Sequence, residues 1–160
     1  MSTKRGSRKP RANSAPAESP AQPTGEAPPV ALARVPISVR WRDLDAFNHV
    51  NNSNFLTYVE EARLQWLSGV EGHWFGEDMM PIIAATHMNY RRQLSWPGRI
   101  VVELYATRVG TTSVTLGHRI VDPEDASVLY ADGDAVIVWI DPQSGRPVSL
   151  PEAIVKASRL

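Results

Sequence analysis

Two acids and a histidine, Asp43, Asp45 and His49, stand where a strand-like apolar pattern ends and a helical pattern begins. The first turn of a helix leaves backbone N–H groups without partners and carries the positive end of the helix dipole. A carboxylate beside such donors can attack a carbonyl, or activate water against it, while the donors hold the carbonyl oxygen. The segment is therefore a candidate catalytic site for carbonyl chemistry.

A strand is predicted just before the acids, and a helix just after them. Every second residue of this segment is apolar, at Val35, Ile37, Val39 and Trp41, and the residues between them are less apolar. This alternation predicts a strand with one buried face. Residues 51–68 predict a helix, because a single stripe is formed by Phe55, Val59, Ala62 and Trp66. Leu56 and Leu67 widen this stripe, and Asn51 and Asn52 are residue types that cap helix starts.

The rest of the chain predicts an antiparallel sheet. Strand patterns separated by turn residues cover 81–90, 99–109, 113–121 and 128–140, and Pro151 can start a short final helix. One long helix on a long, curved antiparallel sheet is the simplest arrangement that buries both apolar faces. The predicted class is α+β, a single domain whose central helix is wrapped by the sheet. Its open edge strand favours pairing with a second copy.

The composition excludes several classes of function. Lys and Arg total 17 and Asp and Glu total 17, so the net charge gives no reason to expect a nucleic-acid partner. The chain has no cysteine, which excludes a thiolate nucleophile and a disulfide framework. No apolar run reaches the ~20 residues that span a bilayer. We expect a cytoplasmic protein without a membrane span.

Residues 1–33 differ in composition from the rest of the chain. They hold six of the 13 prolines, no aromatic residue and a basic cluster of Lys4, Arg5, Arg8, Lys9 and Arg11. Such a segment cannot bury enough apolar surface to offset the entropy lost on ordering. We therefore expect a disordered Pro/Ala-rich basic tail over 1–33 and one domain over 34–160.

The segment 43–52, Asp-Leu-Asp-Ala-Phe-Asn-His-Val-Asn-Asn, together with segments 89–94 and 97–98, resembles the hotdog-fold thioesterases. The likeness covers roughly residues 35–155. The acyl-CoA thioesterases of the 4-hydroxybenzoyl-CoA thioesterase type are nearest in size. This resemblance implies one hotdog domain, hydrolysis of acyl-CoA thioesters to free acid and CoA, and a homodimer or homotetramer. It implies no cofactor and no metal.

The resemblance also implies roles for residues in the segment. Asp45 is the catalytic carboxylate, as general base or nucleophile, and His49 is a second catalytic candidate that orients the water or holds Asp45. The backbone N–H groups of Asn51 and Asn52 polarise the thioester carbonyl.

The acyl chain needs a binding pocket, which Phe47 and Phe55 are expected to line. In the family, a backbone N–H near the position of Met80, supplied by the partner subunit, also helps to shape the site.

Two alternatives stay open at this stage. The plant acyl-carrier-protein thioesterases have counterparts of Asp45 and His49, but this chain has Phe47 and Asn89 where those enzymes have asparagine and glutamate. A non-catalytic module that binds acyl thioesters is the other alternative. Asp43 is expected to be structural, pairing with a neighbouring arginine.

Overall fold

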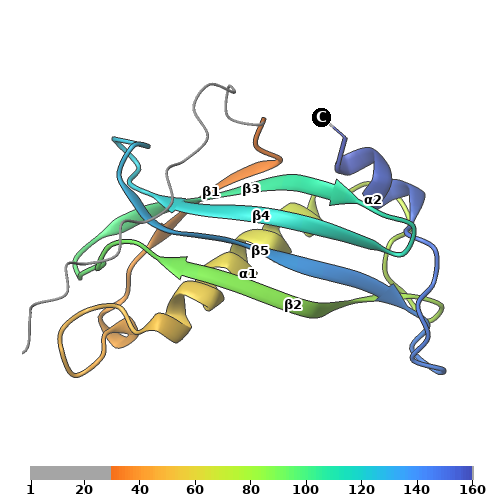
Figure 1. Ribbon diagram of the computed structural model, residues 1–160, viewed down its shortest axis with the longest axis horizontal. Coiled ribbons are helices and arrows are strands. Elements are labelled where there is room, and N and C mark those ends of the chain that lie inside the picture. The colour runs from red at the N-terminus through yellow and green to blue at the C-terminus, as the bar shows by residue number, and fades with distance from the viewer. Residues whose placement is uncertain (1–29, 160) are drawn as a thin grey trace, which may run out of the picture.

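The computed structural model describes residues 30–159. Its elements, in chain order, are β1 (Ala33–Ser38), a 3-10 turn at Trp41–Asp43, α1 (Asn52–Ser68), β2 (Met80–Tyr90), β3 (Arg99–Val109), β4 (Ser113–Val121), β5 (Leu129–Ile140) and α2 (Glu152–Ala157). Figure 1 shows the start of α1 and the end of β2 at the same end of the molecule, which is where the candidate site lies.

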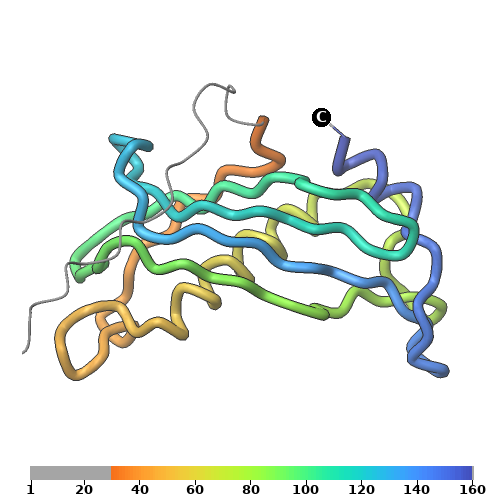
Figure 2. The backbone as a smooth tube through the Cα atoms, viewed as in Figure 1, coloured from red at the N-terminus to blue at the C-terminus, as the bar shows by residue number. Residues whose placement is uncertain are grey.

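The five strands form one antiparallel sheet in the order β1-β3-β4-β5-β2. The smooth trace in Figure 2 follows α1 across one face of this sheet. The predicted α+β arrangement of one long helix on one antiparallel sheet is therefore confirmed. Because β2 pairs only with β5, its outer edge has no strand beside it within residues 30–159.

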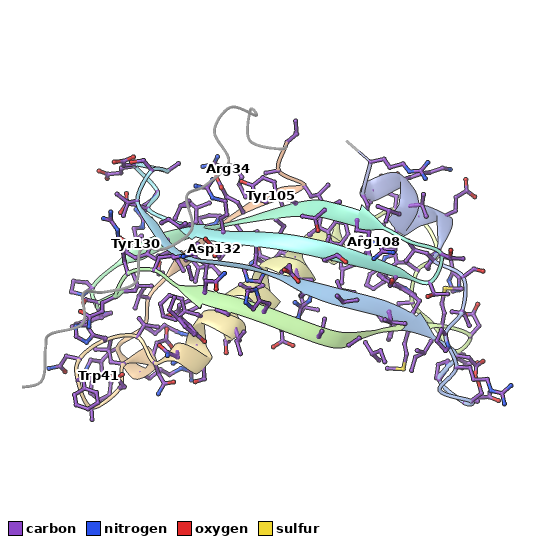
Figure 3. The ribbon with its side chains drawn as sticks, viewed as in Figure 1. Arg34, Trp41, Tyr105, Arg108, Tyr130 and Asp132 are labelled. Carbon is purple, nitrogen blue, oxygen red and sulfur yellow. The ribbon has the colours of Figure 1, made fainter. Side chains whose placement is uncertain are left out.

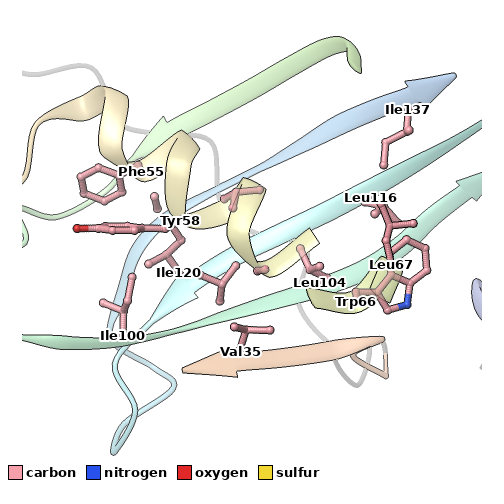
Figure 4. Close-up of a cluster of buried hydrophobic side chains, with 14 of the residues drawn as sticks. Val35, Phe55, Tyr58, Trp66, Leu67, Ile100, Leu104, Leu116, Ile120 and Ile137 are labelled. Atoms are coloured by element: carbon pink, nitrogen blue, oxygen red, sulfur yellow. The ribbon is translucent and has the colours of Figure 1, made fainter. Parts of the chain in front are cut away.

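The apolar stripe of α1 forms the centre of the core. Its four predicted members, Phe55, Val59, Ala62 and Trp66, are all buried. They pack with side chains from the sheet that Figure 4 shows, among them Ile100, Leu104, Leu116 and Ile120. Burial of such side chains is worth about 1.5–3 kcal/mol each, which fixes α1 against the sheet. Leu56, which the pattern also assigned to the stripe, is 41% exposed instead.

The first strand ends earlier than the alternation predicted. β1 stops at Ser38, and Trp41 lies in the 3-10 turn with 72% of its surface exposed. The Asp43 carboxylate accepts the Arg40 N–H at 2.9 Å, and the Asp43 N–H donates to the Arg40 carbonyl at 2.9 Å. These two hydrogen bonds between Arg40 and Asp43 turn the backbone out of the strand. The Asp43 side chain therefore ends β1 before the apolar alternation ends.

Two sequence predictions concern the ends of the chain and the membrane. The expected tail over 1–33 lies mostly outside the described residues, and β1 begins at Ala33, one residue before the expected domain boundary at 34. Among the described residues, no helix is both long enough and apolar enough to cross a membrane.

The close approach of β2 to β5 depends on Gly133. A side chain there would place its Cβ 2.0 Å from the His87 carbonyl oxygen and 2.9 Å from Nε2 of His118. His118 is buried beside it on β4, and this burial lowers the pKa of its imidazole to about 4. The histidine is therefore neutral near pH 7.

Candidate active site

A tight loop brings Asp45 and His49 together. The Asp45 N–H donates to the His49 carbonyl at 2.8 Å, and the Asn48 N–H donates to the Asp45 carbonyl at 3.2 Å. Asn48 has φ of +61°, a left-handed conformation that asparagine tolerates better than most residues. The loop therefore fixes the relative position of the two catalytic candidates.

The Asp45 carboxylate is oriented by backbone donors. Its Oδ1 accepts the N–H of Phe47 at 2.8 Å and the N–H of His49 at 3.3 Å. Its Oδ2 makes no hydrogen bond with any described residue. One oxygen thus holds the carboxylate still, and the other stays available for water or a carbonyl carbon.

Asp43 anchors this loop to α1. Its side chain is 2% exposed and accepts the Tyr58 hydroxyl at 2.7 Å and the Arg40 Nε at 3.1 Å. Its carbonyl oxygen accepts the Asn51 N–H at 2.9 Å and the Asn54 side-chain amide at 2.8 Å. The expected structural role of Asp43, paired with a neighbouring arginine, is confirmed.

The buried Asp43 carboxylate is ionised. Burial by itself raises its pKa, but the hydrogen bonds from Arg40 and Tyr58 outweigh burial and bring the pKa below the ordinary value of 3.8. The stability this group adds is therefore complete above the unfolded-state pKa and is lost as pH falls through the lower folded-state pKa.

We expect Asp43→Ala to lower the free energy of unfolding by about 3 kcal/mol at pH 7, because it leaves the buried Tyr58 hydroxyl without an acceptor and removes the side-chain bonds to Arg40. Urea unfolding at fixed protein concentration measures this loss. Asp43→Asn keeps an acceptor for Tyr58 and should lose less. A change under about 0.5 kcal/mol for Asp43→Ala, the size of an ordinary surface substitution, would contradict the anchoring role.

One backbone N–H at the start of α1 has no hydrogen-bond partner among the described residues. Asn51 is the N-cap, and its side chain accepts the Ser53 N–H at 3.0 Å. Its own N–H already donates to Asp43, so it is not available to a substrate. The Asn52 N–H makes no hydrogen bond with any residue that the structure describes. Of the two donors suggested by the sequence, Asn52 is the free one.

A cavity of about 510 Å³ opens beside these groups. It brings together five of the candidate residues, Asp45, Phe47, His49, Asn52 and Phe55, and it is also lined by Val50, Tyr90, Arg91, Arg92 and Gln93. Asn51 and Met80 do not line it. Phe47 is 80% exposed at the cavity, whereas Phe55 is buried in the core with one side toward it.

Tyr90 is the residue at this cavity that the sequence did not single out. Its register partner on β5 is the buried Ala131, which places Tyr90 on the face of the sheet that holds α1. The signal was present in the segment 89–94, whose likeness to the thioesterases was noted without a role for this tyrosine.

The side chains on either side of Tyr90 in sequence both bind a carboxylate of β5. Asn89 donates to Asp132 at 2.9 Å, and the Arg91 guanidinium pairs with the same carboxylate at 3.1 Å. Figure 3 shows Asp132 on the side that faces away from α1. The Asn89 amide and the Arg91 guanidinium are thus both engaged by Asp132.

Comparison with known proteins gives consistent relatives. Residues 39–157 match the model of the Thioesterase-like superfamily. A solved structure of a proposed acyl-CoA thioesterase from Xanthomonas campestris is 55% identical, covers 72% of this chain and 98% of its own, and superposes with a TM-score of 0.66.

Two further relatives are more distant. A Thermus thermophilus thioesterase, solved in complex with coenzyme A and Zn, is 32% identical over 81% of this chain and 92% of its own, with a TM-score of 0.67. The acyl-CoA thioester hydrolase YbgC of Escherichia coli is 24% identical over 130 residues, which cover 78% of this chain and 93% of YbgC.

Proposed function

The chain belongs to the Thioesterase-like superfamily, hotdog-fold thioester hydrolases, and from that premise we propose that it hydrolyses acyl-CoA thioesters to the free acid and CoA with Asp45 as the catalytic carboxylate. The observation that carries the proposal is the Asp45 side chain, which backbone donors hold at the cavity with one oxygen free. Relatives with this activity, and one with bound coenzyme A, support the substrate class.

In this mechanism the thioester carbonyl lies between Asp45 and the start of α1. The free N–H of Asn52 donates to the carbonyl oxygen and stabilises the negative charge that forms there. In one route Asp45 takes the proton of an attacking water, the carbon–sulfur bond breaks, and the same proton passes to the departing thiolate to give the CoA thiol. In the other route Asp45 attacks the carbonyl carbon and the carbon–sulfur bond breaks to leave an acyl–aspartyl anhydride. Water then hydrolyses this anhydride to the free acid and Asp45, and a proton from water completes the CoA thiol. His49 lines the same cavity as Asp45, and we assign it the role of orienting the water that completes hydrolysis.

The alternative carrier-protein thioesterase has less support. The glutamate of those enzymes corresponds to Asn89, which is bound to Asp132 on the other face of the sheet. Phe47 occupies the position of their asparagine and presents an exposed ring instead of an amide. A side-by-side assay with acyl-CoA and acyl-carrier protein compares the two substrates directly.

The direct test is release of CoA thiol from a panel of acyl-CoAs of different chain length and ring content. Turnover above background with at least one of them is the expected result. If no acyl-CoA is hydrolysed but one binds tightly, the protein is a binding module instead, and the proposed reaction is wrong.

We also propose that the working unit contains a homodimer formed through β2. The free edge of β2 carries Ile82 and Ile83, which are 37% and 42% exposed. On α1, Leu56 and Leu64 are 41% and 55% exposed. An unpaired edge beside exposed apolar side chains is the usual setting for strand pairing between copies.

Such a dimer would complete the catalytic cavity. Ala85 is the middle residue of β2, so an antiparallel pair centred there places Met80 of the partner subunit opposite Tyr90. Tyr90 lines the cavity that contains Asp45. The proposed position of Met80 in the site therefore depends on the second copy.

Replacing Ile83 by Asp places a charge on this edge and should produce a monomer with thioesterase activity at least about tenfold lower, because an interface rejects an unpaired carboxylate. Light scattering gives the mass and the thiol assay gives the rate. Val30→Asp, at an apolar residue that is 72% exposed and outside the sheet, is the matched control. An Ile83→Asp protein that stays dimeric and active would refute the β2 interface.

A further inference from the structure

We propose that Tyr90 is a positioning residue that holds Asn52, and with it the free N–H donor of the site, in the geometry that stabilises the transition state. This proposal rests on the thioesterase function proposed above. Tyr90 makes no contact with the reacting atoms in it and acts through the backbone of α1.

Two contacts join Tyr90 to the beginning of α1. Its hydroxyl donates to the Asn52 carbonyl oxygen at 3.2 Å. Its ring meets the Phe55 ring edge-on, with centroids 5.4 Å apart and planes at 87°, a favourable arrangement of two aromatic rings. Both contacts reach the first turn of the helix, where the unoccupied N–H lies.

Within residues 30–159, the Tyr90 hydroxyl makes the one hydrogen bond that joins β2 to α1. The helix start is also held by the loop before it, since Asn51 and Asn54 both donate to the Asp43 carbonyl. The residues on either side of Asn52 are therefore fixed to Asp43, and the Asn52 carbonyl is fixed to the edge strand.

The position of Asn52 matters because it decides where the donor points. A polarising N–H is effective only when it is aimed at the place where charge develops, and a displacement of about 1 Å can cost a factor of ~10² in rate. The bond from Tyr90 acts on the carbonyl of the same residue whose N–H is free. Tyr90 is also the last residue of β2, the strand that would pair with the second copy. It therefore connects the proposed dimer edge to the Asn52 N–H.

Tyr90→Phe removes the hydroxyl and keeps the ring against Phe55. We expect kcat for acyl-CoA hydrolysis to fall about tenfold while KM stays within about twofold, because the donor is needed mainly in the transition state. Tyr130→Phe is the matched control, since the Tyr130 hydroxyl also donates one hydrogen bond of similar length, to Asp122 at 3.3 Å, away from the cavity. Tyr130→Phe should keep the wild-type kcat.

Amide hydrogen exchange gives a second readout that needs no turnover. The N–H of Leu56 is the helical partner of the Asn52 carbonyl. Its exchange should therefore be faster in Tyr90→Phe than in the wild type, and in Tyr130→Phe it should keep the wild-type rate. A wild-type protein without thioesterase activity would defeat the proposed function, and the exchange rates would still decide the role of Tyr90. If Tyr90→Phe matches the wild type in kcat and in Leu56 exchange, or loses only melting temperature, the positioning role is wrong.

Discussion

Replacing Asp45 by Ala is expected to lower kcat for acyl-CoA hydrolysis by a factor of about 10²–10⁴, the range for loss of a positioned acid or base. The change removes the Oδ2 that makes no hydrogen bond with a described residue and also the Oδ1 that accepts the N–H groups of Phe47 and His49. Steady-state kinetics with the best acyl-CoA from the panel measures the loss.

Asp45→Asn separates chemistry from loop geometry. The amide oxygen can still accept the two backbone N–H groups, but the side chain can neither take a proton nor act as a nucleophile at neutral pH. We expect the Asn variant to be nearly as inactive as the Ala variant while its melting temperature stays near that of the wild type. An active Asp45→Asn protein would mean that Asp45 only shapes the turn and is not the catalytic carboxylate.

Replacing Asn52 by Pro is expected to lower kcat by a factor of about 10²–10³, the cost of one lost oxyanion donor. Proline has no N–H, and it is well tolerated at the first position of a helix, where its fixed φ suits the backbone. Asn51, the preceding residue, has φ of −58° and ψ of 138°, a conformation compatible with a following proline. The substitution therefore removes the donor and leaves α1 intact.

Asn52→Ala is the matched control for this variant. It removes the exposed side chain and retains the backbone N–H, so its kcat should stay close to the wild-type value. Circular dichroism and thermal unfolding establish that both variants keep α1. Equal rates for the Pro and Ala variants would mean that another group polarises the thioester carbonyl.

The regular elements could be predicted closely because their signals are local. β3 and β4 have the predicted bounds, and α1 begins at Asn52 after the N-cap Asn51. Apolar spacing reports which face is buried, and a cap residue reports where a helix begins. The end of β1 was mispredicted because Asp43 captures the Arg40 backbone, a contact that the apolar alternation does not encode.

The predicted role of Leu56 failed for a different reason. The helical pattern correctly places it near the apolar stripe, but α1 packs over β1 and β3 and leaves this flank uncovered. The exposed position of Leu56 is one of the observations from which the β2 dimer was proposed above. The cytoplasmic location and the basic tail stay predictions.

The sequence by itself determined the place of the candidate site and the residue types in it, because segment 43–52 combines a carboxylate, a histidine and a helix start in one short stretch. Only the tertiary structure decided which of these groups are free to act. Asp43 occupies the N–H of Asn51 and leaves that of Asn52 open, and Tyr90 reaches Asn52 from a distant strand. Hydrogen-bond partners of this kind are set by long-range packing, and that packing separates the structural acid Asp43 from the proposed catalytic acid Asp45.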